Sequence, residues 1–231
     1  MERTEIAGIR KCYGKKEVLR GIELELKEGS CAGILGSNGS GKSTLLSILG
    51  GVLRADAGQF LYRGRDLLKD QAFRSRTVGY LPQGNPLFEE LSAEDNLLLW
   101  YEKKALSEAL SDGLPMLLGI NAFLKVRVSR LSGGMKRRLA MACAAAADPR
   151  ILLLDEPSAA VDLLCREKIY SYLERYKKDG GSIILTTHDA LELPLCDACY
   201  LMRDGVLERF DYDGDVRGLA QLLQKAVGKD G

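Results

Sequence analysis

Residues 36 to 44 read Gly36-Ser37-Asn38-Gly39-Ser40-Gly41-Lys42-Ser43-Thr44, which fits the phosphate-binding loop pattern G-x-x-x-x-G-K-[ST]. The apolar run 32–35 before the loop predicts a buried strand, and the run 45–49 after it predicts the first turns of a helix. Glycines allow successive backbone N–H groups to face one point, at which the positive end of the helix is also aimed. This context predicts a binding site for the phosphates of a nucleoside triphosphate.

Two side chains of the loop supply chemistry that a tight turn does not require. Lys42 provides a mobile cation for the β- and γ-phosphates, and Ser43 provides a hydroxyl ligand for Mg²⁺. A strand-to-helix turn that used glycine for its geometry alone would explain neither residue. We therefore expect the segment Ser37 to Thr44 to hold the nucleotide, with Mg²⁺ as a second cofactor.

Length and charge narrow the class of protein. The 231 residues are 46% hydrophobic, which is enough for a sizeable core, and 33 basic residues against 32 acidic ones leave a net charge of +1. A net charge this small produces only a weak electrostatic field, which favours binding neither to nucleic acid nor to an anionic membrane surface. Uninterrupted apolar stretches stay well below the roughly 20 residues of a membrane span, so we expect any membrane connection to come through a partner.

The cysteines are scattered rather than arranged as a framework of disulfides. They lie at positions 12, 31, 143, 165, 196 and 199, within segments that read as strands and helices, which is typical of reduced thiols in a cytosolic protein. The pair Cys196 and Cys199 forms a C-x-x-C, but a metal site would need a second pair or nearby histidines. His188 is the single histidine of the sequence, so a metal or redox role for the pair is disfavoured.

Hydrophobic patterning predicts an α/β domain in three parts. Apolar and polar residues alternate over 4–28, as in antiparallel strands with one solvated face. The continuous apolar run 151–154 is typical of a buried parallel strand, and 182–187, with its apolar centre, reads as the next buried strand. We expect one domain over 1–231, with an α/β core that includes the antiparallel β part (1–83 and 148–231) and a helical insertion (84–147). Local signals also predict a strand from Thr77 to Leu81, a helix start at Ser92 with Asp95, a helix that runs to Ala147, a hairpin over 198–210 and a final helix from Asp213 to Val227.

Polar residues follow two of the buried runs. Asp155 and Glu156 end the first, and His188 ends the second. Ligands in open α/β sheets bind at the carboxyl ends of the strands, which is where the phosphate loop also begins. We predict Asp155 as a Mg²⁺ ligand, Glu156 as the base for an attacking water and His188 as a hydrogen-bond partner of the γ-phosphate. An isolated histidine would more often be an ordinary satisfied side chain.

A second anion-binding helix start is predicted at Ser132-Gly133-Gly134. A serine and two glycines that open a helix leave a set of free N–H groups. The same residues would also serve as a simple helix cap, and only their combination with the phosphate loop favours a binding role.

The chain resembles the ATP-binding subunits of ABC transporters over essentially its whole length. The resemblance rests on motifs that occur in the family's order: Gly36–Thr44 as Walker A, Gln83 as the Q-loop glutamine, Leu131–Met135 as the signature, Ile151–Glu156 as Walker B, Ser158–Asp162 as the D-loop and His188 as the switch histidine. Tyr13 lies where the family stacks an aromatic ring on adenine. Met135 departs from the usual signature glutamine, and the remaining signature residues are expected to keep γ-phosphate binding.

The resemblance implies a P-loop NTPase that hydrolyses ATP with Mg²⁺. Gln83 is expected to contact both Mg²⁺ and the lytic water, Glu156 to be the catalytic glutamate, and Lys42 and His188 to assist. It also implies a head-to-tail dimer in which Ser132, Gly133 and Gly134 of one subunit close on the ATP of the other, with two identical chains as the expected pairing. The other implied partner is a transmembrane permease, which would hold the chain on the cytoplasmic face of the cell membrane.

Finer assignments stay open at the level of the sequence. The run S-G-G-M-K-R-R and the short helical insertion are similar to subunits of ABC-2-type and drug-efflux exporters. Leu87, Phe88 and Leu91 are equally compatible with a groove for a permease helix and with internal packing. The alternative function is a soluble ABC ATPase that acts on nucleic acid or ribosomes, and a cassette that binds ATP without hydrolysing it is disfavoured by Glu156 and His188. The transported substrate is not encoded in these residues.

Overall fold

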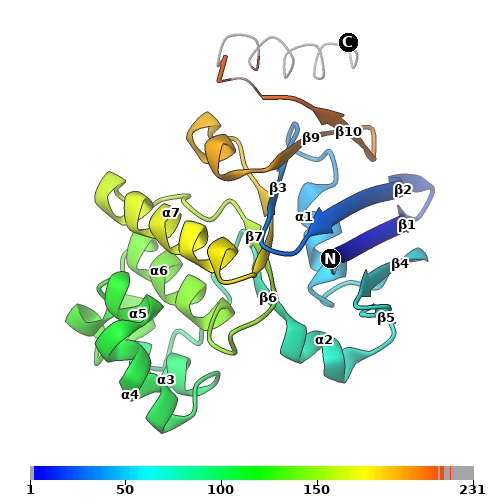
Figure 1. Cartoon of the computed structure of the whole chain (residues 1–231). Helices are drawn as coiled ribbons and strands as arrows, with labels where there is room; N and C mark the ends of the chain where they lie inside the picture. The colour runs from blue at the N-terminus through cyan, green and yellow to red at the C-terminus, as the bar shows by residue number, and fades with distance from the viewer. Residues whose placement is uncertain (1–2, 213, 216–218, 220–231) are drawn as a thin grey trace.

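The structure is a computed structural model that describes residues 3–212, 214, 215 and 219. The helix predicted from Asp213 to Val227 falls almost wholly outside these residues. Figure 1 shows two sheets with one helix between them and a group of helices on the far side of the larger sheet.

An antiparallel sheet forms the first part of the described chain, in the order β2-β1-β4-β5. Its strands are β1 (Arg3–Tyr13), β2 (Lys16–Lys27), β4 (Ala57–Tyr62) and β5 (Arg65–Asp66). Side chains on β2 alternate as the sequence predicts, since Ile22, Leu24 and Leu26 are buried while the charged residues between them are exposed. One face of this sheet is therefore solvated and the other packs inward.

A larger, mostly parallel sheet has the order β10-β9-β3-β8-β7-β6 among the described strands. Its bounds are β3 (Cys31–Leu35), β6 (Val78–Leu81), β7 (Ile151–Asp155), β8 (Ser182–Thr186), β9 (Ala198–Arg203) and β10 (Val206–Phe210). Every residue of β3, β7 and β8 is buried, as the continuous apolar runs predict. β9 and β10 form the predicted hairpin at the edge.

The larger sheet separates two hydrophobic cores. Helix α1 (Lys42–Leu49) packs between the two sheets together with Ile151 and Leu153 of β7. Leu152 and Leu154 of the same strand face the opposite core, which lies under the helices. The two-residue period of a strand thus sends neighbouring side chains of β7 into different layers.

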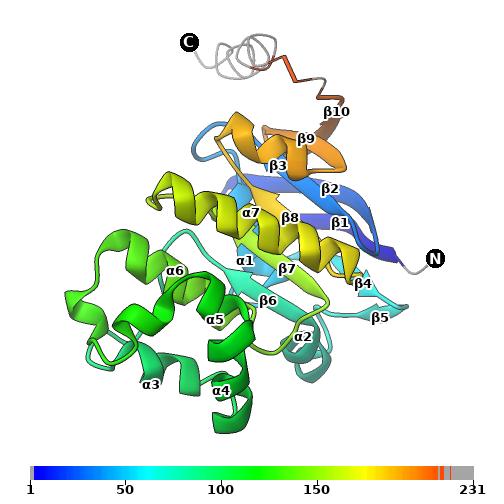
Figure 2. The same ribbon diagram turned by 60° about the vertical axis from the view of Figure 1, so that its left-hand side comes forward.

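Helices cover the second face of the larger sheet (Figure 2). Between β6 and β7 lie α3 (Ala93–Leu98), α4 (Lys103–Asp112), α5 (Leu114–Leu117), α6 (Gly133–Ala144) and the short 3₁₀ turns η1 (Ile120–Phe123) and η2 (Val128–Arg130). α7 (Leu163–Lys178) follows β7. Ser92 and Asp95 form the predicted capping box of α3. The boundaries 84 and 147 of the helical part remain our proposal.

Several local features differ from the sequence-based expectations. Thr77 ends helix α2 (Gln71–Thr77) instead of beginning a strand, and Asp70 caps the start of α2 by accepting the N–H of Phe73. α6 ends at Ala144, short of the predicted Ala147, because Pro149 cannot continue a helix and the chain turns at Asp148 with a φ of 46°. Each helix in the described part of the chain is too short or too polar to cross a bilayer.

Candidate functional site

A polar cavity of about 390 Å³ opens where β3, β7 and β8 end. Its walls combine residues from the phosphate loop with residues from four other segments: Val18, Asn38, Gly39, Gly41, Lys42, Ser43, Thr44, Gln83, Glu156 and His188. Most of the predicted site residues therefore meet in one place. The lining is polar and cationic at the loop, and it carries a carboxylate and an imidazole on the opposite side.

The loop owes its shape to glycine at two positions. Gly39 has a φ of +79° and Gly41 a φ of +112°, which disfavour residues with a Cβ. A Cβ on Gly41 would also lie 2.9 Å from the Leu19 side chain and 3.1 Å from the Val18 carbonyl oxygen. Helix α1 begins directly afterwards at Lys42, so its first N–H groups point toward the loop and the cavity.

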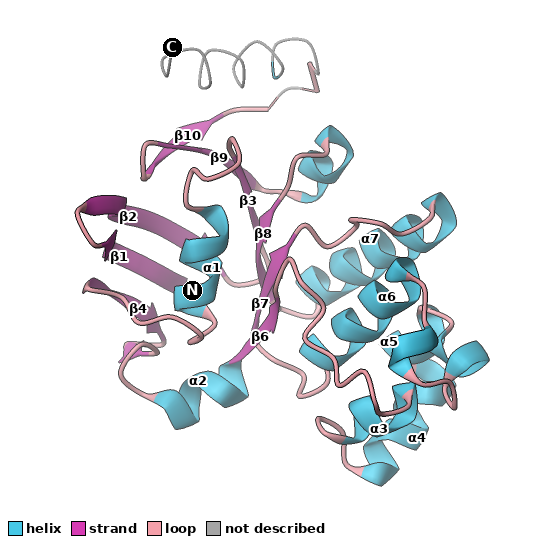
Figure 3. Cartoon of the chain, turned by 180° about the vertical axis from the view of Figure 1, so that it is seen from behind, coloured by secondary structure: helices cyan, strands magenta, loops and turns pink. Residues whose placement is uncertain are grey.

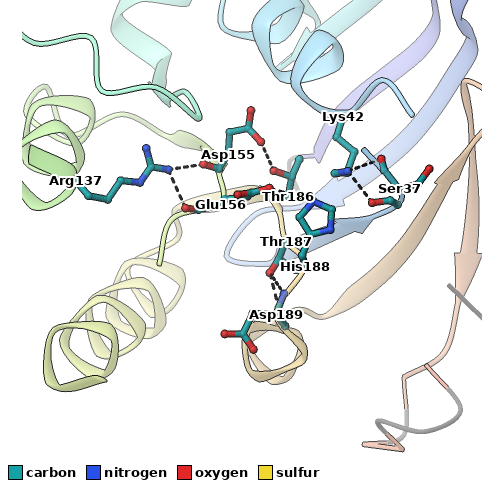
Figure 4. A network of polar contacts seen from close by, with 10 residues as sticks. Ser37, Lys42, Arg137, Asp155, Glu156, Thr186, Thr187, His188 and Asp189 are labelled. Atoms are coloured by element: carbon teal, nitrogen blue, oxygen red, sulfur yellow. Dashed lines mark hydrogen bonds and ion pairs between the residues drawn. The ribbon is translucent and has the colours of Figure 1, made fainter. Parts of the chain in front are cut away.

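Lys42 is held by the main chain of its own loop. Its Nζ donates to the carbonyl oxygens of Gly36 at 2.8 Å and Ser37 at 3.0 Å, as Figure 4 shows. Burial lowers the pKa of Lys42, while the charges of Glu156 and Asp155 raise it in part. The ammonium is thereby fixed at the cavity with two carboxylates in its field.

Asp155 lies at the end of β7 with a buried carboxylate that is 2% exposed as a whole residue. The hydroxyl of Thr186 donates to Asp155 Oδ1, whereas Oδ2 is buried and has no hydrogen-bond partner in the described part of the chain. A buried carboxylate oxygen without a donor is unfavourable unless a cation or water meets it. The donor set of Asp155, Ser43 and Gln83 therefore fits a hard cation such as Mg²⁺.

Glu156 departs from the geometry of the strand that precedes it. Its φ of 55° is left-handed, a conformation that is strained for a residue with a side chain and that recurs at functional sites. Glu156 Oε1 lies 3.1 Å from Nε2 of His188, and the two side chains are 23% and 43% exposed. The structure thus pairs the predicted base with the predicted switch histidine at the mouth of the cavity.

Arg137 on α6 is a site residue that the sequence analysis missed. The side chain is buried, and its guanidinium donates to the carbonyl oxygens of Pro82 at 2.6 Å and Glu156 at 2.9 Å, and also to that of Asp155. These bonds join α6 to the segment of Gln83 and to the end of β7, where Figure 4 shows the bonds to Asp155 and Glu156. The sequence signal that could have revealed Arg137 is its position four residues before Met141, which places it on the same apolar, buried face of the helix.

The remaining predicted residues lie outside the cavity walls. Ser132 caps α6 by accepting the N–H of Met135 at 3.2 Å, and neither Ser132 nor Gly133 or Gly134 lines the cavity. Tyr13 ends β1 with 49% of its surface exposed and is likewise absent from the walls, where Val18 stands instead. A single chain therefore does not bring the start of α6 to the cavity at the start of α1.

The segment after Gln83 divides between packing and exposure. Leu87 packs against the core under the helices, Leu91 is half-buried, and Phe88 is 62% exposed. Asn96 fixes the segment, because its side chain accepts the N–H of Phe88 at 2.9 Å and donates to its carbonyl oxygen at 3.1 Å. Leu98, Leu99 and Trp100 at the end of α3 are also exposed, so apolar side chains face outward on this part of the molecule.

The cysteines are free thiols wherever the structure describes them. Cys31 Sγ lies 3.8 Å from Cys196 Sγ, and burial raises the pKa of the Cys143 thiol to about 12. No cluster of three or more potential metal ligands occurs among the His, Cys, Asp and Glu side chains of the described residues. Protonated, buried thiols are poor nucleophiles.

The sequence of this chain is similar to those of known ATP-binding proteins of transport systems. The family model described as ABC transporter matches residues 19–159. The linearmycin resistance ATP-binding protein LnrL of Bacillus subtilis is 33% identical over 85% of this chain, and the chain spans 65% of that relative. The lipoprotein-releasing system ATP-binding protein LolD of Porphyromonas gingivalis is 34% identical over 88% of this chain and 97% of its own length. A spermidine/putrescine import ATP-binding protein of Spiroplasma citri is 36% identical, over 89% and 60%.

Solved structures agree with the fold. An ATP-binding cassette in a dimeric, post-hydrolysis state with ADP and Pi matches with a TM-score of 0.78 at 27% identity, covering 89% of this chain and 97% of that one. A nucleotide-free cassette matches with a TM-score of 0.83 at 22% identity, covering 99% and 98%. The predicted α/β fold with an antiparallel β part and helices is confirmed. Because the names of the relatives include resistance, release and import systems, they leave the direction of transport undetermined.

Proposed function

The chain belongs to the ABC transporter family, whose ATP-binding subunits couple ATP hydrolysis to transport, and on that premise we propose that Glu156 and His188 perform the hydrolysis here. The observation that carries the proposal is the 3.1 Å contact between Glu156 Oε1 and His188 Nε2 on the wall of a cavity that the phosphate loop also lines. A carboxylate with a hydrogen-bonded imidazole is suited to take a proton from water and to orient it.

The phosphate loop provides the binding half of the mechanism. The N–H groups of the loop and of the first turn of α1 surround the β- and γ-phosphates, and Lys42 adds a cation. Glu156 accepts a proton from the attacking water, and His188 donates a hydrogen bond to the γ-phosphate. The water attacks phosphorus and the bond to the bridging oxygen breaks, so that ADP leaves as charge moves toward Lys42.

Ser43, Gln83 and Asp155 are the residues that would hold Mg²⁺. The unpartnered Oδ2 of Asp155 and the place of Ser43 and Gln83 in the cavity wall support this set. When bound, Mg²⁺ neutralises charge on the β- and γ-phosphate oxygens. Asp155 is kept in orientation by the hydroxyl of Thr186.

We propose a head-to-tail dimer as the working form. Ser132, Gly133 and Gly134 stand at an exposed or half-exposed helix start outside the cavity of their own chain, so a second subunit has to supply the N–H groups that close over the γ-phosphate. Support comes from the related cassette that is a dimer with ADP and Pi. Two identical chains satisfy the geometry, since each would carry one phosphate loop and one signature.

The second proposed partner is a transmembrane permease. The exposed Phe88 and the exposed Leu98, Leu99 and Trp100 offer an apolar surface beside the Gln83 segment, suited to an amphipathic helix. Such contact would hold the chain at the cytoplasmic face of the cell membrane. The run from Ser132 to Arg138 and the similarity to a resistance protein favour export, whereas the net charge of +1 gives the nucleic-acid alternative no support.

Phosphate release and gel filtration of Glu156→Gln test the proposal. The amide keeps the size of the side chain and cannot take a proton, so we expect ATP binding to survive, hydrolysis to fall by about 100-fold or more, and the protein to shift to a dimer with Mg-ATP. Glu174→Gln, on an exposed part of α7, is the matched control. Normal turnover of Glu156→Gln would refute Glu156 as the base. A monomer with ATP bound would refute the dimer in the absence of the permease.

A further inference from the structure

Glu192 is a buried carboxylate that the proposed mechanism leaves unused. It lies in the 3₁₀ turn η3 (Ala190–Leu195), four residues after His188, and is 1% exposed. Carboxylates are rarely buried so completely unless they are paired or hydrogen-bonded. The salt bridges among the described residues give Glu192 no cationic partner, and the nearby Arg166 pairs with Asp189 instead, at 2.6 Å.

The side chain of Glu192 reaches the loop that follows the catalytic glutamate. Ser158, two residues after Glu156 and also buried, donates its hydroxyl to Glu192 Oε1. Glu192 Oε2 is buried without a hydrogen-bond partner in the part of the chain that the structure describes. One buried acceptor therefore anchors the segment in which Glu156 adopts its left-handed φ of 55°.

The turn that carries Glu192 follows His188 closely in the chain and is bonded to the residues on either side of it. Thr187 accepts the N–H of Asp189 through its hydroxyl at 2.8 Å, and Asp189 accepts the N–H of Leu191 at 2.9 Å. Figure 4 shows Thr187 and Asp189 on either side of His188 in the chain. Glu156, Ser158, Thr187, His188 and Glu192 all line one cavity of about 320 Å³ beside the catalytic pair.

Titratable and charged groups face Glu192 from α6, from α7 and from the segments beside it in space. Burial raises the pKa of its carboxyl, and the charge of Asp189 adds to this, whereas the hydroxyls of Ser158 and Thr187 lower the pKa. From α7, Tyr170 and Arg166 face the same region, and Arg137 of α6 senses the charge of Glu192. The Glu192 side chain thus reaches the loop after Glu156 through the Ser158 hydroxyl, and its own turn is joined to the residue after His188 because the Glu192 N–H donates to the Asp189 carbonyl oxygen at 3.1 Å.

We propose that Glu192 is a positioning residue for ATP hydrolysis, holding Ser158 against the turn that follows His188 so that Glu156 and His188 keep their relative positions. The role rests on the proposed function of Glu156 and His188. Glu192 lies outside the wall of the cavity that the phosphate loop lines, and it acts by fixing the loop after β7 against the turn after β8. Displacing a reacting group by about 1 Å lowers a rate by about 100-fold, so loss of this anchor is expected to act on turnover.

Four variants test the role: Glu192→Ala, Glu192→Gln, Ser158→Ala and the double variant Glu192→Ala/Ser158→Ala. For each, kcat and KM come from phosphate release, the Kd from a fluorescent ATP analogue, and the melting temperature from scanning fluorimetry. We expect Glu192→Ala to lower kcat by about 10- to 100-fold with the Kd unchanged within about twofold. Glu192→Gln, which keeps an acceptor for Ser158, should recover most of kcat, and the double variant should lose no more than Glu192→Ala alone.

Controls separate this proposal from the function on which it rests. Glu174→Ala, an exposed glutamate of α7, should match wild type in all readouts, and Glu156→Gln reports on the proposed function by itself. Unchanged kcat in Glu192→Ala, or an equal loss of kcat in the Gln and Ala variants, would overturn the positioning role while leaving Glu156 in place. If Glu192→Ala does not fold, additivity of Ser158→Ala with Glu192→Gln would overturn it instead.

Discussion

Replacing Arg137 by methionine removes the donors that hold the catalytic strand end to the signature helix. In the native protein the buried guanidinium bonds the carbonyl oxygens of Pro82, Asp155 and Glu156. Glu156 keeps a second donor, the N–H of Ala159 at 3.1 Å, so its carbonyl stays satisfied in the variant. At about 1 to 1.5 kcal/mol net per hydrogen bond, the three lost bonds amount to about 3 to 4.5 kcal/mol.

Burial of the guanidinium itself offsets part of that loss. It lowers the pKa of Arg137, which means that the charged form is less well solvated in the fold than in water. We therefore expect Arg137→Met to lower the free energy of unfolding by about 2 to 4 kcal/mol. The methionine fills most of the volume, so the loss should report the hydrogen bonds and not a cavity.

Urea unfolding followed by circular dichroism measures the change, and phosphate release measures its effect on turnover. The adjacent Arg138→Met is the matched control, because Arg138 is half-buried and donates to the Leu118 carbonyl oxygen at 2.9 Å, and it should lose about 1 kcal/mol. A loss of less than about 0.5 kcal/mol in Arg137→Met, or a loss no larger than in the control, would refute the role of these bonds.

Three further perturbations have outcomes that the structure sets. In Gly41→Ala a φ of +112° is combined with a Cβ that lies 2.9 Å from the Leu19 side chain, whereas in Gly39→Ala the φ is +79° and the Cβ meets open space. Isothermal titration with ATP should show the larger loss of affinity for Gly41→Ala. Equal losses would contradict a steric role for Gly41. Asp155→Asn keeps an acceptor for Thr186 but loses its charge, so a magnesium titration of ATPase activity should shift to concentrations higher by about 10-fold or more, and an unshifted midpoint would exclude Asp155 as a ligand. Burial raises the pKa of the Glu192 carboxyl above 4.5. The protonated carboxyl therefore supports folding below pH 4.5, and this contribution is lost as the pH rises through the raised folded pKa. The melting temperature of Glu192→Gln should gain on that of the wild type as the pH increases from 4.5, and a difference that does not change with pH would contradict this.

The sequence predicts those parts of the fold in which local pattern and burial agree. Leu24 and Leu26 alternate with glutamates on β2, and the run from Ile151 to Leu154 is buried throughout. The start of α3 follows from Ser92 and Asp95, whose side chains bond the backbone within one turn. Periodicity and caps are local quantities, and they carry over to the structure without knowledge of the rest of the chain.

Features that depend on distant partners were not predictable in this way. Arg137 bonds Pro82, which is 55 positions away, and no local pattern encodes that pairing. α2 has a side-chain cap at Asp70 and support from Arg74, which donates to the Leu67 carbonyl at 2.9 Å, but its residues show no apolar period. The left-handed φ of Glu156 likewise depends on the strand and turn that enclose it.

The candidate site shows the same division. Lys42, Ser43, Gln83, Glu156 and His188 meet as predicted in one cavity wall, because the ends of neighbouring parallel strands share an edge. Tyr13 was assigned by resemblance alone, and Val18 stands in the wall instead. The roles of these residues in binding and catalysis remain proposals that the variants above address.

Strand β7 acts as a partition whose two sides can be altered separately. Ile151 and Leu153 belong to the core that contains α1, and Leu152 and Leu154 belong to the core under the helices. A change of side-chain volume at position 153 is expected to alter nucleotide affinity. The same change at position 152 is expected to alter the packing of the signature helix against the sheet. Alternate residues of a single strand thus contact the nucleotide-binding layer and the helical layer separately.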